Sequence, residues 1–187
     1  MDYDSYLQNE KLQAVHRTIN TFLTLIVVVI GFNVLTPIYD DLSGLKAERI
    51  VQSEITQLVE DEGYRPKPYK DSLGKLTIGF GHLIKEGETF DDLTPHKAVE
   101  MLRKDYANAS EDVERMYDWA DGDVKLVLIN MTYQMGSNGL SKFQKTINYL
   151  KTDQYDLAAG EMLTSRWANQ TPRRASRLAG RIMSLGG

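Results

Sequence analysis

The sequence of 187 residues contains no cysteine, and it has only three histidines, five prolines and two tryptophans. Without cysteine, the chain can form no disulfide and carries no thiolate nucleophile. The histidines, His16, His82 and His96, are too scattered to indicate a metal site, so we expect neither a metal ion nor a cofactor. The length suits one domain with a real core and a modest extension.

Basic side chains are fewer than acidic ones: the chain has 22 Lys and Arg residues and 26 Asp and Glu residues, which gives a net charge of -4. This balance argues against nucleic acid as the main partner. Residues 85–123 hold 12 acidic and 5 basic side chains, whereas residues 142–187 hold 3 acidic and 8 basic ones. The basic part is compatible with an anionic polymer as partner, and two solvated helix faces are the alternative explanation.

One hydrophobic run is long: residues 18–39, TINTFLTLIVVVIGFNVLTPIY, contain no charged side chain over 22 positions. About 20 mostly apolar residues cross the hydrocarbon core of a bilayer as a helix. No polar face interrupts Phe22 to Phe32 and no small-residue cleavage site follows, so the run predicts a transmembrane signal anchor rather than a core helix or a removable signal peptide. The flanking Lys and Arg residues modestly favour a cytoplasmic segment at residues 1–17.

The remainder of the chain is predicted to be α+β and mainly helical. Apolar positions in residues 43–62 recur on one helical face, which predicts a helix that ends with Glu62 before Gly63. Two prolines and the alternating KLTIGFGH then predict a small β-hairpin. Further helices are expected to start at Thr94, to end at Gly136, to start at Ser141, to cover YDLAAGEMLTSRW, and to start at Thr171.

Two carboxylates flank this hairpin, Glu62 at the end of a helix and Asp71 just before the turn. Glycoside hydrolysis uses such a pair, in which one acid protonates the leaving oxygen and the other carboxylate assists the attack. Thr77 could hold a water between them, and Gly79 and Gly81 would let a polymer approach the backbone. Solvated surface charge, strand propensity and a β-bulge are the alternative explanations for these residues.

The run E-G-x-R-x-x-x-Y-x-D-x-x-G-x-x-T-x-G-x-G-H closely resembles the active-site signature of the T-even phage lysozymes. It is filled here by Glu62, Gly63, Arg65, Tyr69, Asp71, Gly74, Thr77, Gly79, Gly81 and His82. Two later stretches, LINMTYQMG and SRWANQTPRRASR, resemble the same family in the expected order. The resemblance therefore covers most of residues 53–181.

The resemblance implies a phage endolysin for host cell lysis, a muramidase that hydrolyses the β-1,4 bond between N-acetylmuramic acid and N-acetylglucosamine in bacterial peptidoglycan. It implies a lysozyme-like two-lobed domain at residues 53–187, with a small β-hairpin lobe and a larger helical lobe, after a linker or helix at residues 40–52. Glu62 matches the general acid, Asp71 the second catalytic carboxylate, and Thr77 the residue that positions the attacking water. Inversion of the anomeric centre is expected.

Four further residues are expected to line or support the cleft. Arg174 matches an arginine that pairs with the catalytic Glu, and Tyr133 and Gln134 match cleft-lining positions of the family. His82, within the signature, is expected to be a hydrogen-bonded structural residue rather than a proton shuttle.

The hydrophobic run distinguishes this chain from soluble family members and is similar to that of the signal-anchor endolysins. The similarity implies three partners, namely peptidoglycan, the host inner membrane and the host export machinery, with a monomeric catalytic domain in the periplasm. The Val-, Ile- and Leu-rich centre of the run leaves both permanent anchoring and release at lysis open. A lytic transglycosylase and a non-catalytic wall-binding protein are the alternative functions, and the presence of both Asp71 and Thr77 favours a muramidase.

Overall fold

The computed structural model describes residues 36–71 and 74–187, with side chains from residue 43 onward. The chain divides into two compact units, Met1–Val51 and Gln52–Gly187. Nothing in the described ranges is a helix of the length and apolar character that crossing a bilayer requires. The predicted anchor falls outside the described residues, apart from its last positions, which begin the first described helix.

That helix, α2, spans Thr36–Glu62 and ends where the sequence pattern predicts. The chain leaves it at Gly63, whose φ of +69° departs from helical geometry and whose N–H still donates to the Val59 carbonyl at 3.3 Å. In the second unit, Ile55 and Leu58 of this helix are fully buried. Burial of this apolar face therefore fixes the orientation of the end of α2, and with it the position of Glu62.

A three-stranded antiparallel sheet follows, built from β1 (Arg65–Lys70), β2 (Leu76–Gly79) and β3 (His82–Leu83) in that order. Tyr69 lies opposite Thr77 across the first pair of strands, and Ile78 lies opposite His82 across the second. The predicted hairpin is thus present, and a short third strand extends it. Ile78 is fully buried and anchors the sheet to the same core as the end of α2.

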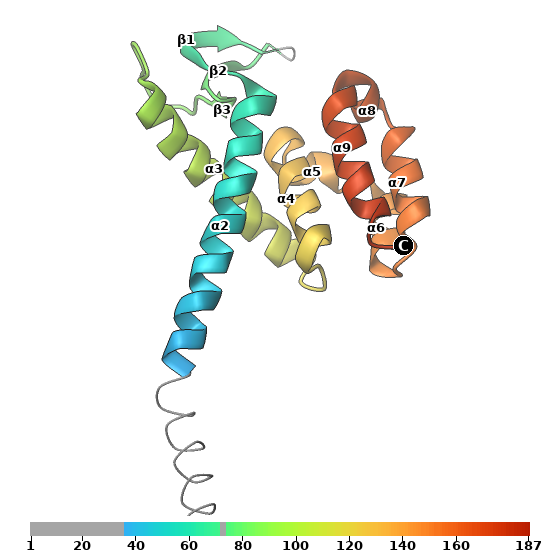
Figure 1. Cartoon of the computed structure of the whole chain (residues 1–187). Helices are drawn as coiled ribbons and strands as arrows, with labels where there is room; N and C mark the ends of the chain where they lie inside the picture. The colour runs from blue at the N-terminus through green and yellow to red at the C-terminus, as the bar shows by residue number, and fades with distance from the viewer. Residues whose placement is uncertain (1–35, 72–73) are drawn as a thin grey trace, which may run out of the picture. The chain divides into compact units, whose positions relative to one another are not determined.

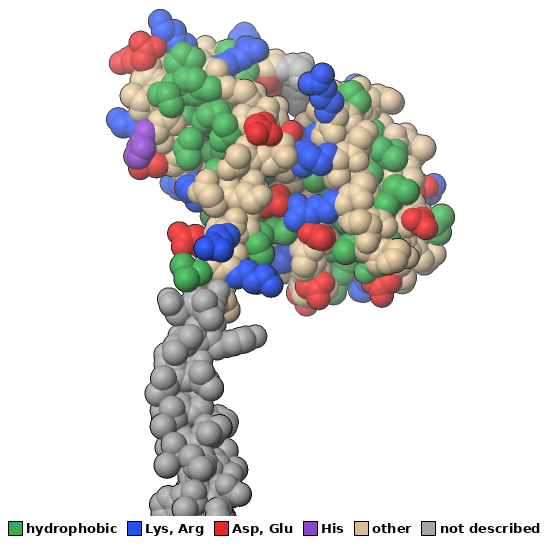
Figure 2. Space-filling model, viewed as in Figure 1, with side chains coloured by type: hydrophobic (Ala, Val, Ile, Leu, Met, Phe, Trp, Pro, Cys, Tyr) green, Lys and Arg blue, Asp and Glu red, His purple; other side chains and the backbone are tan. Residues whose placement is uncertain are grey.

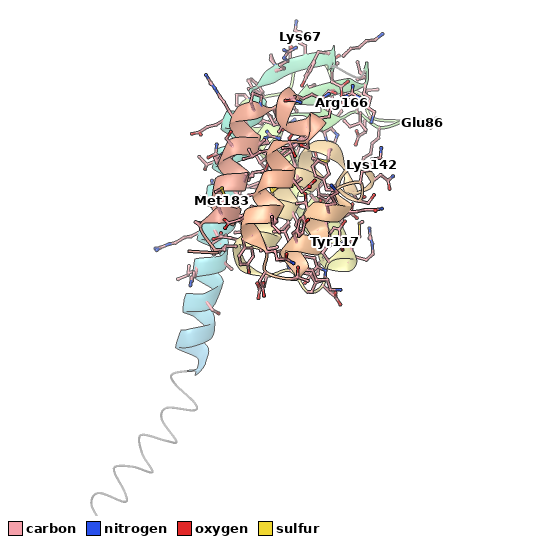
Figure 3. The ribbon with its side chains drawn as sticks, turned by 90° about the vertical axis from the view of Figure 1, so that its right-hand side faces the viewer. Lys67, Glu86, Tyr117, Lys142, Arg166 and Met183 are labelled. Carbon is pink, nitrogen blue, oxygen red and sulfur yellow. The ribbon has the colours of Figure 1, made fainter. Side chains whose placement is uncertain are left out.

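Helices form the rest of the second unit (Figure 1). They are α3 (Pro95–Met116), α4 (Gly122–Met135), α5 (Ser137–Leu140), α6 (Gln144–Lys151), α7 (Tyr155–Leu163), α8 (Arg166–Gln170) and α9 (Pro172–Met183). Thr94 caps α3 by accepting a hydrogen bond from the Lys97 N–H at 3.4 Å, and α4 ends at Gly136, as the sequence predicts. Figure 3, turned by 90°, shows α9 at the front and Arg166 of α8 toward the end of the unit that carries the sheet.

Two predicted helix boundaries are wrong. Ser141 does not start a helix, because it follows α5, donates to the Asn138 carbonyl at 3.0 Å, and leaves α6 to begin at Gln144. The stretch YDLAAGEMLTSRW is not one helix either. Ser165 interrupts it, since its hydroxyl donates to the Met162 carbonyl at 2.7 Å and accepts from the Ala168 N–H at 3.1 Å, which caps α8.

The core is centred on α4, where Val127, Leu128 and Met131 are fully buried. Helices α3, α7 and α9 contribute further buried faces to one continuous cluster, which also includes the sheet residue Ile78. One core thus holds the sheet, the end of α2 and the helical part together. The mainly helical architecture with one small sheet agrees with the expected lysozyme fold.

Candidate active site

Glu62, the last residue of α2, forms an ion pair with Arg174 of α9. The Arg174 Nη2 donates to the Glu62 Oε1 at 2.8 Å. The arginine side chain is 5 % exposed and the glutamate side chain 21 %, so the pair is largely shielded from solvent and the glutamate is its more accessible member. The pairing expected from the family resemblance is therefore present.

Asp61 shares the same arginine, with its Oδ2 lying 3.1 Å from the Arg174 Nε. Arg177, one helical turn further along α9, donates to the same Asp61 oxygen. Figure 2 shows acidic and basic side chains together where α2 and α9 face each other. The sequence analysis missed Asp61. The pattern that could have indicated its role is a carboxylate next to Glu62 together with two arginines three positions apart, which lie on one face of a helix.

Gly81 lies against the second oxygen of the Glu62 carboxyl group. Its φ is +86°, a conformation that side chains disfavour, and a Cβ at this position would lie 3.2 Å from the Glu62 Oε2. The oxygen that does not bond Arg174 thus faces a residue without a side chain. The backbone of Gly81 therefore packs closely against this oxygen, and a side chain at position 81 would displace the Glu62 carboxyl group.

The side chains of Asp71 and Thr77 both form hydrogen bonds to the backbone of Lys75, at the end of the hairpin. The Lys75 N–H donates to the Asp71 Oδ1 at 2.8 Å, and the Thr77 hydroxyl donates to the Lys75 carbonyl at 3.1 Å. Thr77 is 4 % exposed. One backbone residue therefore fixes the positions of the carboxylate and the hydroxyl relative to each other.

The phenol of Tyr69, on β1, has a pKa that both carboxylates affect. Burial raises the pKa of its phenol most, Arg65 opposes this, and the negative charges of Glu62 and Asp71 raise the pKa further. The Arg65 guanidinium stacks over the ring, 4.3 Å from its centroid. Tyr69 therefore lies within electrostatic reach of both Glu62 and Asp71.

Tyr133 and Gln134, at the end of α4, are half-buried, and their polar groups form hydrogen bonds to other residues of the protein. The Tyr133 hydroxyl donates to the Phe80 carbonyl at 2.6 Å, and burial, followed by the charge of Glu62, raises its pKa. Gln134 accepts a hydrogen bond from the Trp167 indole at 2.7 Å. The amide of Gln134 thus supports Trp167.

His82 bonds two carboxylates, as expected for a structural residue. Its Nδ1 lies 2.6 Å from the Asp105 Oδ2 of α3, and its Nε2 lies 3.1 Å from the Glu88 Oε2. The hydrogen bond to Asp105 raises the pKa of His82 most, burial opposes the rise, and Glu88 adds to it. The sequence analysis missed both carboxylates. Asp105 lies on α3, 23 positions after His82, where no local pattern links it to the hairpin, whereas Glu88 lies only six positions after His82.

Comparisons of the sequence with known proteins indicate one family. The family model described as Phage lysozyme matches residues 59–182, more than half of the chain. Probable T4-type lysozyme 2 of Dictyostelium discoideum is 30% identical over 157 residues, which cover 69% of this chain and 92% of that protein. Probable T4-type lysozyme 1 of the same organism is 28% identical over the same shares of the two chains.

A third relative is a much longer protein. Pre-baseplate central spike protein Gp5 of Enterobacteria phage T4 is 27% identical over 161 residues, which cover 69% of this chain but only 28% of that protein. The match to the family model and the two matches over nearly the whole length of a relative agree with the motif resemblance. The chain therefore belongs to the phage lysozyme family.

Proposed function

We propose that this protein is a muramidase that hydrolyses the β-1,4 bond between N-acetylmuramic acid and N-acetylglucosamine in bacterial peptidoglycan. The observation that carries the proposal is the environment of Glu62. Its carboxyl group is held by the buried Arg174 on one oxygen and faces the bare backbone of Gly81 on the other. A carboxyl group that is held through one oxygen, while its other oxygen does not bond Arg174, suits proton delivery to a glycosidic oxygen.

Glu62 acts as the general acid in this proposal. It gives its proton to the glycosidic oxygen while the bond between that oxygen and the anomeric carbon breaks. Arg174 then stabilises the carboxylate that remains, because the guanidinium already lies 2.8 Å from one of its oxygens. The other oxygen, which does not bond Arg174, carries the proton that passes to the glycosidic oxygen.

Asp71 and Thr77 position and activate the water that attacks the anomeric carbon. The Thr77 hydroxyl donates its only proton to the Lys75 carbonyl, so it meets a water molecule as an acceptor. Asp71, held by the Lys75 N–H, accepts the second proton of the same water as the new bond to carbon forms. The attack comes from the face opposite the leaving oxygen and inverts the anomeric centre.

The products test this mechanism against its alternatives. The full-length protein, purified in detergent, is incubated with peptidoglycan sacculi, and the new sugar ends are identified by NMR and mass spectrometry. Hydrolysis with inversion gives a reducing N-acetylmuramic acid that first appears as the α-anomer. A 1,6-anhydro end would identify a lytic transglycosylase instead, and binding without new ends would identify a non-catalytic wall-binding protein.

The N-terminal part is proposed to be a signal anchor in the host inner membrane. The support is the sequence of residues 18–39, which contains no charged side chain over 22 positions. In this proposal residues 1–17 are cytoplasmic, residues 40–52, which belong to α2, connect the anchor to the enzyme, and a monomeric catalytic domain at residues 53–187 lies in the periplasm. The host export machinery inserts the anchor, and the enzyme acts at host cell lysis, either tethered or after release.

Charged substitutions within the anchor test its insertion. Replacing both Val27 and Val28 with Lys adds about 2.5–3.5 kcal/mol per residue to the free energy of insertion. In a Gram-negative host we expect the unaltered protein in the membrane pellet, with its C-terminal part accessible to protease in spheroplasts. The doubly substituted protein should leave the membrane fraction. Equal membrane retention of both proteins would contradict an anchor at these residues.

A further inference from the structure

Tyr133 of α4 connects the helical part of the second unit to the turn between β2 and β3. The turn runs from Gly79, the last residue of β2, through Phe80 and Gly81. The Tyr133 hydroxyl donates to the Phe80 carbonyl at 2.6 Å. Burial raises the pKa of this hydroxyl, so it keeps its proton and remains a donor. A side chain 53 positions away in the sequence therefore holds the middle of the turn.

The peptide group that Tyr133 bonds also carries the contact between Gly81 and Glu62. The Phe80 carbonyl and the Gly81 Cα lie in one peptide plane, so a bond that fixes the carbonyl also restricts the position of this Cα. A Cβ at Gly81 would lie only 3.2 Å from the Glu62 Oε2. The hydrogen bond from Tyr133 therefore acts on the backbone that packs against the Glu62 carboxyl group.

This backbone contact complements the ion pair between Glu62 and Arg174. The bond of 2.8 Å from the Arg174 Nη2 holds the Glu62 Oε1. The last torsion angle of a glutamate side chain has a broad distribution, so a carboxyl group that is bonded through one oxygen can still rotate. The backbone of Gly81, which packs against the Oε2, limits this rotation.

The turn itself depends on contacts with the rest of the protein. Gly79 has a φ of +65° and Gly81 a φ of +86°, and two glycines among three residues give the backbone much conformational freedom. Gly79 packs against the Leu93 side chain, which a Cβ at position 79 would approach to 3.0 Å, and the Phe80 side chain is buried. Packing thus holds the first part of the turn, and the bond from Tyr133 holds the peptide that leads to Gly81.

We propose that Tyr133 is a positioning residue for the general acid, because its hydroxyl holds the peptide between Phe80 and Gly81 so that this backbone and Arg174 together orient the Glu62 carboxyl group. Tyr133 acts through the backbone and makes no contribution to binding of the sugar through its hydroxyl. The inference rests on the proposed muramidase function, since it assigns a role in proton transfer from Glu62. It predicts that loss of the hydroxyl slows bond cleavage and leaves substrate affinity nearly unchanged.

Tyr133→Phe tests the inference, because it removes the hydroxyl and keeps the ring. The full-length protein in detergent is incubated with soluble glycan strands that retain their stem peptides, prepared from sacculi with an endopeptidase, and the new reducing ends are counted. We expect kcat to fall about tenfold and KM to change by less than about twofold, because a misoriented acid affects the transition state rather than binding. Circular dichroism and urea unfolding check that the variant folds.

Tyr64→Phe is the matched control. The Tyr64 hydroxyl donates to the Leu93 carbonyl, so this change also removes a bond from a half-buried tyrosine to the main chain. The bond of Tyr64 ends on Leu93 and not on the turn that meets Glu62. We therefore expect Tyr64→Phe and Tyr133→Phe to lower the urea midpoint by similar amounts, while kcat of Tyr64→Phe stays within about twofold of the unaltered protein.

A double variant tests whether Tyr133 acts through Gly81. Gly81→Ala displaces the Glu62 carboxyl group by itself, so the bond from Tyr133 can no longer hold this group in its productive position. Adding Tyr133→Phe to Gly81→Ala should therefore slow hydrolysis by no more than about a further twofold. Independent effects would multiply to at least about a hundredfold instead.

The outcomes separate this inference from the proposed function. If the unaltered protein hydrolyses the strands, three results would each overturn the inference alone: an unchanged kcat in Tyr133→Phe, an equal loss of kcat in Tyr64→Phe, or multiplied effects in the double variant. A change of Tyr133→Phe confined to KM would overturn it as well. If the folded, unaltered protein hydrolyses neither strands nor sacculi, the proposed function fails and the inference fails with it.

Discussion

Arg174 and Glu62, 112 positions apart in the sequence, meet through a hydrogen bond of 2.8 Å between Nη2 and Oε1. The same guanidinium lies 3.1 Å from Asp61 through its Nε. A planar guanidinium can satisfy two carboxylates at fixed angles, which a single ammonium group cannot do. The end of α2 is therefore fixed to α9 at the residue proposed to donate the proton.

The first prediction concerns Arg174→Lys. Lysine keeps the charge but loses one of the two directed contacts, so we expect about tenfold slower hydrolysis of sacculi and a free energy of unfolding lower by about 1–3 kcal/mol. Rates of turbidity loss and urea unfolding curves measure the two effects. Arg173→Lys, at the exposed neighbouring position, is the control and should change neither quantity. Unchanged activity in Arg174→Lys would show that the double contact has no catalytic importance.

The second prediction compares alanine at two glycines with nearly the same backbone. Gly81 has a φ of +86° with Glu62 next to the missing side chain, whereas Gly87 has a φ of +87° with no atom within 4 Å of it. Both substitutions strain the backbone by roughly 1–2 kcal/mol. Only Gly81→Ala displaces the Glu62 carboxyl group, so we expect it to lower the hydrolysis rate at least about tenfold while Gly87→Ala does not. Similar rates in both variants would contradict the close approach at Gly81.

The third prediction is a pH dependence of stability set by His82, Asp105 and Glu88. Bonding to Asp105 raises the pKa of His82 in the folded protein, so its contribution is complete below the unfolded value of about 6.5 and is lost as the pH rises through the raised value. The pKa of Glu88 is lowered, first by its bond to the Lys85 N–H, so its contribution is lost as the pH falls through the lowered value. The cluster therefore stabilises the fold most between the ordinary pKa of the Glu88 carboxyl group, 4.5, and that of the His82 imidazole, 6.5.

Asp105→Asn isolates the His82 part of this effect. We expect a loss of about 1–3 kcal/mol in the free energy of unfolding near pH 5.5, which shrinks toward zero near pH 9 as the histidine becomes neutral in both proteins. Urea unfolding at several pH values measures the difference. Glu100→Gln removes the acidic partner of the exposed His96 and should change stability by less than about 0.5 kcal/mol. A loss in Asp105→Asn that is independent of pH would contradict the assigned cause.

The fourth prediction concerns Arg181, which bonds Glu54 and Asp123 at 2.6 Å each and thereby links α9 to α2 and α4. The Glu54 side chain is only 7 % exposed. Burial, followed by the charge of Glu54, raises the pKa of the nearby Tyr106 to about 12. Removing the arginine therefore leaves a buried carboxylate without its main partner.

A double-mutant cycle measures this dependence. Arg181→Met should lower the free energy of unfolding by about 3 kcal/mol, and the double variant Glu54→Met, Arg181→Met should recover most of that loss because the uncompensated charge is gone. The exposed Lys145 and Glu161 pair gives a matched comparison, since its removal should change stability by less than about 1 kcal/mol. Additive losses in the double variant would contradict the coupling.

Local signals in the sequence predicted several features of the fold correctly. Thr94 and Gly136 delimit helices because capping and chain reversal depend on the residue itself and its immediate neighbours. The end of α2 at Glu62 follows for the same reason. Ser141 and Ser165 were misassigned because a serine can cap a helix or bond a preceding carbonyl, and tertiary packing decides between the two.

The site was only partly predictable. A motif within one short stretch identified Glu62, Asp71 and Thr77, and the family resemblance identified Arg174. Asp105 and Arg181 were missed because their partners come from distant elements, so no sequence spacing brings the charges together. The bond from Tyr133 to the Phe80 carbonyl likewise appears only once the fold brings α4 and the turn between β2 and β3 together, because 53 positions separate the two residues.

The most direct test of the account is the rate of turbidity loss of purified peptidoglycan sacculi with the full-length protein, beside the same protein carrying Glu62→Gln. Glutamine keeps the size of the side chain and a contact to Arg174 but cannot donate an acidic proton. The account predicts that the unaltered protein clears the sacculi and that the Glu62→Gln protein is slower by at least about a hundredfold. Equal clearing by both proteins, or no clearing by the folded unaltered protein, would contradict the assignment of Glu62 as the catalytic acid of a muramidase.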